Sequence, residues 1–504
     1  MTAGRSALVV GGGLAGVSAA LALADRGHRV TLIESRSRLG GLASSFRRDS
    51  AAGRLTVDNG QHVYLRCCTA YRWFLERIGA AALAPLQRRL DVPVLDAARG
   101  RLGRLHRTAL PAPLHLAASL AGYPHLSAGE RARTVRAAFA LRRLDPQDPA
   151  LDGQSFGDWL HRHGQTGRCV EALWDLVGVA TLNARAGDVS LALAAMVFRT
   201  GLLTRSAAAD IGLPAVPLGE LHHTRAGAAL DRSGVRVRLR TRVRAVRPAA
   251  DGGWRATVRD AAGRPAELTA DTVVLAVPQR ETHGLLPPGA LPDPGGLLRI
   301  GTAPILNVHV IYDRPVLRRP FLAALGTPVQ WVFDRTGPSG LAGGGQYLAL
   351  SQSAAGEEID RPVAELRARY LPELERLLPP AREAAVRDFF VTRERTATFA
   401  PEPGVNRLRP GPRTRAAGLY LAGAWTATGW PATMESAVRS GLAAAEAADA
   451  ADAPAVSGRA SGGARFPAPG KETGASGVAA PAAGGAAAQD PAADAPPVPY
   501  EEHP

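Results

Sequence analysis

The stretch SALVVGGGLAGVSAALALADRG, residues 6–27, constrains the fold of this chain more than any other. Its first five residues predict a short buried strand over 6–10, and the glycines that follow predict a tight turn into a helix of small apolar residues. Gly27 suits the position just after such a helix, and HRVTLIES (28–35) predicts a second strand. This order of strand, helix and strand is the start of an α/β domain with a parallel sheet.

Gly11, Gly13 and Gly16 have the spacing G-x-G-x-x-G between the first strand and the helix. Gly11 permits the tight turn, Gly13 lets the backbone approach a pyrophosphate, and Gly16 allows close packing of helix on strand. The start of the helix offers free N–H groups to phosphates. Glu34 ends the second strand, where a carboxylate can accept hydrogen bonds from ribose hydroxyls. These features together predict a dinucleotide site; the alternative is a glycine-rich turn that binds nothing.

Beyond this unit the chain leaves the α/β domain, returns to it and leaves again. Further strands are predicted at 235–246, 254–260 and 271–278, and the blocks between carry mixed signals and many prolines. We expect an α/β fold, α+β overall, in which a discontinuous Rossmann-like domain is interleaved with a mixed-sheet and helical substrate domain. The expected boundaries are 1–85, 220–280 and 400–449 for the Rossmann-like domain and 86–219 and 281–399 for the substrate domain.

The end of the chain has a different composition from the rest. Residues 450–504 are mostly Ala, Pro, Gly and Ser with scattered acids. Such a segment lacks the apolar side chains needed for a core, so we predict a disordered tail.

The net charge of +15 comes almost entirely from arginine, since Lys471 is the only lysine. The arginines are spread along the chain and often lie near acids, which favours a solvated surface and no nucleic-acid partner. Cys67, Cys68 and Cys169 have no spacing typical of a disulfide framework or a zinc site, so we predict no metal and a reducing cytoplasm. No apolar run is long enough for a transmembrane helix or a signal peptide.

The stretch LAGAWTATGWPATMESAVRSG, residues 421–441, predicts a short strand, a Gly/Thr turn and a helix that opens at Pro431. A helix start lined by small residues leaves room for a ligand in front of it, and its dipole favours negative charge there. Ala424 is unexpected, because a turn that faces a polar ligand often carries a carboxylate at such a position.

The segment ESRSRLGGLASSF (34–46) resembles the second glycine motif of the FAD-dependent amine oxidase and carotenoid desaturase superfamily, and 421–441 resembles the C-terminal flavin motif of the same superfamily. The resemblance implies FAD as cofactor, with the helix at Pro431 directed at the flavin. It departs from the pattern at Ala424, where the superfamily has Asp. The cofactor contacts implied by it and by the glycine turn are Gly11, Gly13, Leu14, Ala15, Gly16, Glu34, Ser35, Arg36, Gly40, Gly41, Leu42, Val243, Gly423, Ala424, Pro431, Ala432, Thr433 and Met434.

Two stretches narrow the resemblance. VDNGQHVYLRCCTAYRWFLERIG (57–79) and AWTATGWPATMESAVRSG (424–441) are similar to the squalene-associated FAD-dependent desaturases, the hydroxysqualene dehydroxylases. The resemblance implies reductive dehydroxylation of hydroxysqualene to squalene in bacterial squalene and hopanoid synthesis. It also implies an unidentified electron donor that reduces FAD, and an apolar polyprenoid substrate.

Asp58 and His62 are the candidate catalytic residues, because they flank the D-N-G-Q-H stretch that the resemblance places beside the flavin. One hypothesis is that either residue assists departure of the substrate hydroxyl as a general acid. The alternative is that both hold the backbone turn by hydrogen bonds. Glu435 invites a similar interpretation, but a carboxylate in the first turn of a helix is stabilising there, and we favour a structural role.

Three other functions stay open. An amine oxidase on the same fold commonly uses an active-site lysine, and this chain has none before Lys471. A carotenoid desaturase or isomerase acts on a similarly long and apolar substrate. A flavin-binding or lipid-carrying protein without catalysis is the third. The apolar stretch 109–126 further suggests a substrate channel or a peripheral contact with the inner face of the cell membrane, for an otherwise cytoplasmic protein.

Overall fold

The computed structural model of this chain describes residues 5–452. The predicted disordered tail over 450–504 lies outside the described residues, apart from its first three residues, which complete the last helix. Among the described residues no helix is both long enough and apolar enough to cross a bilayer.

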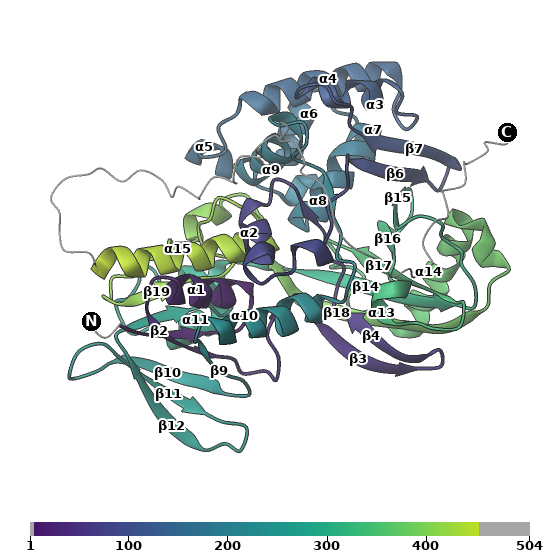
Figure 1. Cartoon of the computed structure of the whole chain (residues 1–504). Coiled ribbons are helices and arrows are strands. Elements are labelled where there is room, and N and C mark those ends of the chain that lie inside the picture. Colours follow the sequence, from purple (N-terminus) through teal and green to yellow (C-terminus); the bar gives the residue numbers. More distant parts are fainter. Residues whose placement is uncertain (1–4, 453–504) are drawn as a thin grey trace, which may run out of the picture. The chain divides into compact units, whose positions relative to one another are not determined.

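A five-stranded parallel sheet with the order β19-β13-β1-β2-β9 forms one layer (Figure 1). Its strands come from three distant parts of the chain, and the central ones are almost wholly buried. They are β1 (Ser6–Val10), β2 (Arg29–Ile33), β9 (Arg236–Arg238), β13 (Thr272–Leu275) and β19 (Leu419–Leu421). The predicted α/β class with a Rossmann-like sheet is therefore confirmed.

Helices α1 (Leu14–Ala24) and α15 (Met434–Asp452) lie side by side against this sheet (Figure 1). Their close approach depends on a missing side chain, since a Cβ added to Gly441 would lie 2.1 Å from the carbonyl oxygen of Ala15. Helix α1 ends at Ala24, three residues before the predicted end, and Gly27 adopts a φ of +85° in the turn to β2.

The prediction of one strand over 235–246 is wrong. Arg240 has a φ of +50°, a left-handed conformation that breaks the extended chain. The first part, β9, joins the parallel sheet, whereas β10 (Arg242–Pro248) starts a three-stranded antiparallel sheet. That sheet continues with β11 (Trp254–Arg259) and β12 (Pro265–Ala270). Alternation of arginine with apolar residues continues across the break, so the pattern alone does not reveal it.

A seven-stranded sheet with the order β18-β14-β17-β16-β15-β6-β7 forms a second layer. Only the β15–β6 pair is parallel, and the other pairs are antiparallel. Helix α14 (Val363–Leu377) covers one face through buried residues such as Leu366 and Leu374. The strands are β6 (Asp91–Asp96), β7 (Arg101–His106), β14 (Thr302–Tyr312), β15 (Phe321–Leu325), β16 (Trp331–Asp334), β17 (Gln346–Gln352) and β18 (Val386–Phe399).

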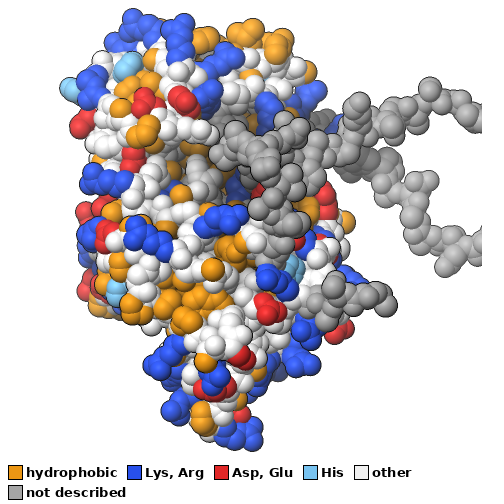
Figure 2. All heavy atoms as spheres, turned by 90° about the vertical axis from the view of Figure 1, so that its left-hand side faces the viewer, with side chains coloured by type: hydrophobic (Ala, Val, Ile, Leu, Met, Phe, Trp, Pro, Cys, Tyr) orange, Lys and Arg blue, Asp and Glu red, His pale blue; other side chains and the backbone are white. Residues whose placement is uncertain are grey.

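Arginine side chains are dispersed over the face drawn in Figure 2, among acidic and neutral side chains. Many of the described arginines take part in ion pairs, as in the exposed pairs Arg104–Asp91 and Arg255–Glu267. The basic charge of the chain is thus spread over this surface and is not gathered in one patch.

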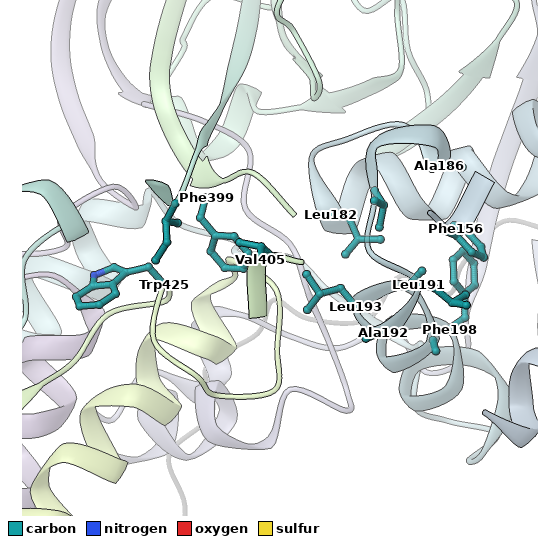
Figure 3. Close-up of a cluster of buried hydrophobic side chains, with 14 of the residues drawn as sticks. Phe156, Leu182, Ala186, Leu191, Ala192, Leu193, Phe198, Phe399, Val405 and Trp425 are labelled. Carbon is teal, nitrogen blue, oxygen red and sulfur yellow. The ribbon is translucent and has the colours of Figure 1, made fainter. Parts of the chain in front are cut away.

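A block of short helices between residues 117 and 203 packs around aromatic side chains. Phe156, Trp174 and Phe198 meet edge to face or at a tilt, with ring centroids 5.0–5.8 Å apart. The same apolar cluster continues through Leu193 to Trp425, so that the block and the turn after β19 share one core (Figure 3). The helices are α3 (Ala117–Ala121), α4 (Ala128–Arg143), α5 (Pro149–Asp152), α6 (Phe156–Arg162), α7 (Gly167–Cys169), α8 (Leu176–Leu182) and α9 (Leu191–Phe198).

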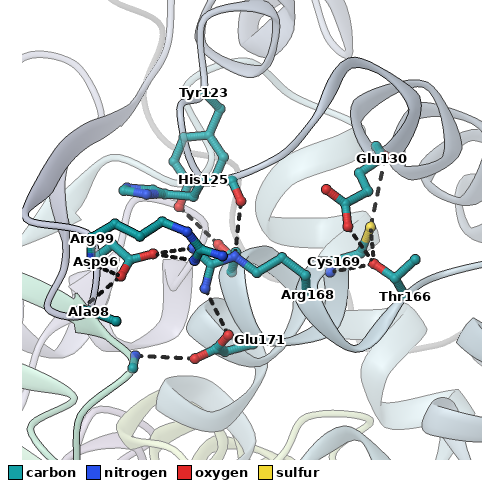
Figure 4. A network of polar contacts seen from close by, with 12 residues as sticks. Asp96, Ala98, Arg99, Tyr123, His125, Glu130, Thr166, Arg168, Cys169 and Glu171 are labelled. Atoms are coloured by element: carbon teal, nitrogen blue, oxygen red, sulfur yellow. Dashed lines mark hydrogen bonds and ion pairs between the residues drawn. The ribbon is translucent and has the colours of Figure 1, made fainter.

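A buried carboxylate joins this helical block to the second sheet. Asp96, at the end of β6, accepts from Arg99 at 2.9 Å and also from Arg168 of α7 (Figure 4). Arg168 in turn contacts Glu171 at 2.8 Å, and Glu171 accepts from the backbone N–H of Gly326 after β15. The network fixes the helices over the edge of the sheet.

The other regular elements are short. The strands are β3 (Ser45–Ser50), β4 (Gly53–Asp58), β5 (Tyr64–Leu65) and β8 (Ile211–Gly212), and the helices are α2 (Thr69–Arg77), α10 (Ala226–Arg232), α11 (Gln279–Leu285), α12 (Gly296–Arg299) and α13 (Thr336–Ser339).

Candidate active site

The glycine turn between β1 and α1 is shaped by close backbone contacts. Gly11 has a φ of +110°, and a Cβ at Gly16 would lie 1.8 Å from the Gly11 carbonyl oxygen. Gly13 is the N-cap of α1, and a Cβ there would lie in ordinary contact with Gly41 Cα, at 3.8 Å. The N–H groups of Leu14 and Ala15 have no acceptor among the described residues. The turn, called the cradle below, thus presents free N–H donors of the kind that bind a phosphate at the start of a helix.

Glu34 lies beside this turn and is 8% exposed. Its carboxylate accepts from the N–H of Gly12 at 2.7 Å and from the N–H of Arg36 at 2.7 Å. The Ser35 hydroxyl donates to the same carboxylate at 3.2 Å. These contacts hold the carboxylate at the edge of the cradle, and a carboxylate has further lone pairs for ribose hydroxyls.

The second glycine segment approaches the first. Gly40 donates to the carbonyl oxygen of Gly12 at 2.9 Å, and a Cβ at Gly41 would lie 3.0 Å from Gly13 Cα. Leu42 is 41% exposed beside them. Arg36 donates to the Gly41 carbonyl at 3.3 Å, so a guanidinium stands near the same cradle.

Backbone hydrogen bonds join the junction of β9 and β10 to the segment that contains Glu34. Thr241 donates to the Glu34 carbonyl at 2.9 Å, and Arg240 donates to the Arg36 carbonyl at 2.9 Å. Val243, two residues further on, is therefore held near the adenosine end of the predicted cofactor site. The structure thus brings the segment that leads to Val243 next to Glu34, although the two are distant in sequence.

Sequence reasoning missed the support beneath the second glycine segment. His222 is fully buried; its Nδ1 donates to the Ala43 carbonyl at 2.8 Å, and its Nε2 accepts from the Tyr71 hydroxyl at 2.9 Å. Burial lowers the pKa of His222 to about 4, so the imidazole is neutral in this role. A histidine inside ELHHTR carries no sequence signal for such a contact.

After β19 the chain makes a turn that only glycine permits. Gly423 has a φ of +145°, and a Cβ there would lie 2.3 Å from the Trp425 indole nitrogen. The Trp425 indole N–H donates to the Val277 carbonyl at 3.0 Å, which fixes the ring in the core. Ala424, between them, is half-buried, and its carbonyl accepts from the Ser436 hydroxyl at 3.1 Å.

Arg409 organises this turn and was not predicted. Its guanidinium is buried and donates to the carbonyls of Thr426, Trp430 and Trp425 at 2.5, 2.8 and 3.2 Å. It also lies 4.5 Å from the ring centroid of Phe399. Burial lowers the pKa of Arg409 to about 10. One arginine among many gives no sequence signal for this position.

Helix α15 begins at Met434, three residues after the predicted start at Pro431. Thr433 caps it, because its hydroxyl accepts from the Ser436 N–H at 3.2 Å and its carbonyl accepts from the Ala437 N–H at 3.0 Å. Pro431 and Ala432 belong to the approach and not to the helix. The predicted helix start facing a ligand is thus formed by Thr433 and Met434.

An apolar cavity of about 440 Å³ opens in front of this helix start. Trp430, Pro431, Thr433 and Met434 form part of its lining, together with several residues between Gln61 and Cys68 and side chains from the helical block and the second sheet. Typical members are Leu65, Val92, Val177, Phe198, Ile305, Phe321, Trp331 and Phe333. A cavity with such walls binds an apolar ligand and excludes water.

The cavity reaches the surface beside α3 and α4. Leu114, Val135 and Phe139 line it and are also 53%, 39% and 43% exposed. The stretch 109–126, predicted as a channel or interfacial segment, therefore contributes Leu114 and its neighbours to the lining. Helix α4 contributes Val135, Phe139 and Arg142 to the lining, and its Arg136 and Arg143 are exposed.

Asp58 does not line the cavity; it lies in a buried ion pair. Its carboxylate accepts from Arg335 at 2.9 Å, from the Ser45 hydroxyl at 2.6 Å and from the Leu218 N–H at 2.9 Å. Arg335 also donates to the Pro214 carbonyl at 2.7 Å. These contacts tie together three segments and favour the structural alternative for Asp58.

His62 lies near the cavity wall without being part of it, and its Nδ1 donates to the Gly60 carbonyl at 3.1 Å. Burial lowers the pKa of His62. With Nδ1 protonated, a neutral imidazole has only a lone pair at Nε2, so it can accept but not donate there. This arrangement suits a base or a positioning group better than an acid.

Glu435 and the paired cysteines line the inner part of the cavity. Glu435 accepts from the N–H groups of Ala70 and Tyr71 at the start of α2 and from Arg439 at 2.6 Å. It therefore has a structural role at the start of α2, which differs from the expected role in the first turn of its own helix. Cys67 and Cys68 are buried free thiols beside that helix start.

A model of the family described as "Flavin containing amine oxidoreductase" matches residues 14–448. The chain belongs to this family. A protein named hydroxysqualene dehydroxylase from Rhodopseudomonas palustris is 30% identical over 87% of this chain and 97% of its own length. A 15-cis-phytoene desaturase from Solanum lycopersicum is 23% identical over 87% of this chain and 77% of its own. A solved putrescine oxidase has a TM-score of 0.66 at 20% identity, over 88% of this chain and 99% of its own, and supports the fold alone.

Membership of the family makes the chain an FAD-dependent oxidoreductase, as predicted. The residues present fit the cofactor. The free N–H groups at α1 and the carboxylate of Glu34 suit the ADP half, and the capped start of α15 meets the apolar cavity. When bound, FAD supplies the redox chemistry, and these residues supply binding and orientation.

Proposed function

We propose that this chain converts hydroxysqualene to squalene. The substrate C–O bond breaks, the oxygen leaves as water with a proton, and the carbon receives a hydride from reduced FAD, which is oxidised. An external electron donor must then reduce FAD again. The similarity to hydroxysqualene dehydroxylases along almost the whole chain supports this reaction.

The observation that carries the proposal is that one apolar cavity joins the start of α15 to the surface. Its walls offer a long hydrocarbon chain contact along its length and exclude water from the end near Trp430 and Met434. An allylic cation that forms there is shielded from hydrolysis. Among the described residues, the ionisable side chains that line the cavity are few, namely Tyr64, Arg142, Glu435 and the two cysteines.

The catalytic assignments stay proposals. We keep His62 as the candidate that positions the substrate hydroxyl, and we assign Asp58 to holding the 58–62 turn through Arg335. A His62→Ala variant with FAD bound that keeps full turnover would remove His62 from the mechanism.

A single-turnover assay tests the reaction. The purified enzyme is reduced with dithionite without oxygen and mixed with hydroxysqualene. We expect the visible flavin band to return in step with squalene, identified by mass spectrometry. No squalene and no reoxidation would refute the proposal.

A phytoene-type desaturase is the second candidate, because phytoene desaturases are among the relatives and the cavity suits any long polyprenoid. The two functions move electrons in opposite directions. Phytoene would bleach the oxidised enzyme under a desaturase, whereas hydroxysqualene would reoxidise the reduced enzyme under a dehydroxylase. Testing both substrates on one enzyme preparation therefore distinguishes the two functions.

We further propose that the mouth of the cavity contacts the cytoplasmic face of the cell membrane. Leu114, Val135 and Phe139 are exposed apolar side chains at the mouth, and α4 adds arginines such as Arg136 and Arg143 beside them. Apolar side chains next to cations suit the interface of an anionic bilayer. A substrate as apolar as a C30 polyprenoid would enter from lipid.

A further inference from the structure

The cavity contains one buried amide that lacks a partner. Gln61 lines the cavity, and its Nε2 is buried without a hydrogen-bond partner among the described residues. None of the other cavity-lining residues that the structure describes has a buried side-chain nitrogen or oxygen in this condition. An unpaired buried donor costs free energy, which a ligand oxygen can recover.

Several other polar groups of the lining already have partners. The Thr181 hydroxyl donates to the Val177 carbonyl at 2.8 Å, and the Ser119 hydroxyl donates to the Arg104 carbonyl at 2.9 Å. Glu435 is occupied by α2 and Arg439. The hydroxyls of Ser351 and Ser353 also reach the lining, and they are the natural competitors of Gln61.

The backbone just before Gln61 is fixed by contacts of Asn59. Asn59 donates to the Leu42 carbonyl at 2.8 Å and to Glu394 at 2.9 Å, and its side-chain oxygen accepts from the Ser44 N–H at 2.9 Å. The Asn307 amide donates to the Asn59 carbonyl at 3.1 Å. Gln61 is thereby held between the second glycine segment and the cavity.

We propose that the Gln61 carboxamide recognises the hydroxyl of the substrate, with Nε2–H donating to its oxygen. Gln61 is then a positioning and specificity residue, since a carboxamide has no proton to give at neutral pH. Its hydrogen bond determines which carbon of the long hydrocarbon substrate lies at the inner end of the cavity. It also favours binding of an alcohol over the hydrocarbon of the same length. This inference rests on the proposed function and adds the group that selects its substrate.

A binding comparison tests it without turnover. Oxidised holoenzyme is titrated with hydroxysqualene and with squalene, and the change in flavin absorption gives each dissociation constant. Gln61→Met keeps the length and removes the donor. We expect it to lower the preference for hydroxysqualene over squalene about tenfold, with squalene affinity unchanged. Gln61→Asn, which keeps an amide, should restore part of the preference.

Thr181→Val is the matched control, because it removes a hydroxyl of the same lining whose hydrogen bond is already made. Its preference should equal that of the native chain. An unchanged preference in Gln61→Met with FAD bound overturns the inference, as does a loss that follows Ser353→Ala instead. In the single-turnover assay Gln61→Met should raise the hydroxysqualene concentration that gives half the limiting rate more than it lowers that limiting rate. If the native chain prefers the alcohol but makes no squalene, the proposed reaction fails while the recognition by Gln61 stands.

Discussion

Two regions of the molecule differ in the groups that they present to a ligand. One is the cofactor layer, which consists of the parallel sheet with α1 and α15, and the other is the apolar cavity beside it. The cofactor layer presents mainly backbone groups to the expected ligand, at Gly11–Gly16, Gly40–Gly41 and the start of α15. The cavity presents side chains from segments scattered between residues 61 and 435. A site made of backbone depends on a few positions that admit one residue type, whereas a site made of side chains tolerates many apolar combinations.

We expect the largest effect where the cofactor layer has no space for an added side chain. In Gly16→Ala the new Cβ would stand 1.8 Å from a backbone oxygen, which no side-chain movement relieves. We expect a loss of about 3 kcal/mol or more in stability, together with loss of bound FAD. Gly227→Ala in α10 is the control, since its Cβ would meet only Leu39 Cδ1 at 3.9 Å. Thermal unfolding and the visible spectrum measure both. A stable yellow Gly16→Ala protein would contradict the description of this layer.

This difference between backbone and side-chain sites explains which features the sequence predicts and which it does not. Positions that admit only glycine, such as Gly11 and Gly16, leave a fixed spacing that is visible in one chain. The cavity wall needs only apolar bulk from many segments, so neither its shape nor its mouth is visible in the pattern. Arg409 and His222 act through backbone carbonyls brought to them by tertiary packing, and local sequence does not record those contacts. The strand break at Arg240 was missed for the same reason.

The buried pair Asp58–Arg335 joins the end of β4 to the residue after β16, and its loss should also be costly. Asp58→Asn leaves the Arg335 cation buried without its counter-charge, so we expect a loss of about 3–5 kcal/mol in unfolding free energy. The exposed pair Arg104–Asp91 is the control, and Asp91→Asn should cost less than about 1 kcal/mol. Chemical denaturation with FAD saturating measures both. If Asp58→Asn keeps its stability and its flavin but loses turnover, Asp58 is catalytic and our assignment is wrong.

Acid should weaken the support under the second glycine segment. The pKa of His222 is lowered from 6.5 to about 4 by burial, so the unfolded chain binds its proton at a higher pH than the folded chain. Stability from this group is therefore complete above pH 6.5 and decreases as the pH falls toward 4, by about 3 kcal/mol. The His222→Gln variant should be less stable at pH 7, and its free energy of unfolding should change less between pH 6.5 and pH 4. The exposed His161→Gln is the control, and an equal slope in all three proteins would contradict the role of His222.

Ala424 is the position where the layer lacks an expected side-chain contact. Ala424→Asp restores the carboxylate that the superfamily pattern carries, next to a turn already held by Arg409. A hydrogen bond from a ligand hydroxyl to a charged acceptor contributes about 1.5–3 kcal/mol, so FAD should bind roughly ten- to a hundredfold more tightly. Flavin fluorescence during titration of the apoprotein gives the dissociation constant, with Ala424→Asn as the neutral control. Unchanged affinity in both would mean that the cofactor does not approach this turn.

The smallest effect tests the outer end of the cavity. Phe139→Asp places a charge at the mouth, where Phe139 is 43% exposed, and removes an apolar side chain that would enter the bilayer interface. We expect about tenfold weaker binding to vesicles that contain anionic lipid, measured by co-sedimentation, with the flavin spectrum unchanged. Val363→Asp is the control, because Val363 is 40% exposed on α14 and does not line the cavity. Equal binding of the two variants would show that apolar exposure alone, and not the mouth, governs adsorption. Weaker binding of Phe139→Asp alone would mean that the cavity, which the sequence pattern leaves undefined, opens toward lipid.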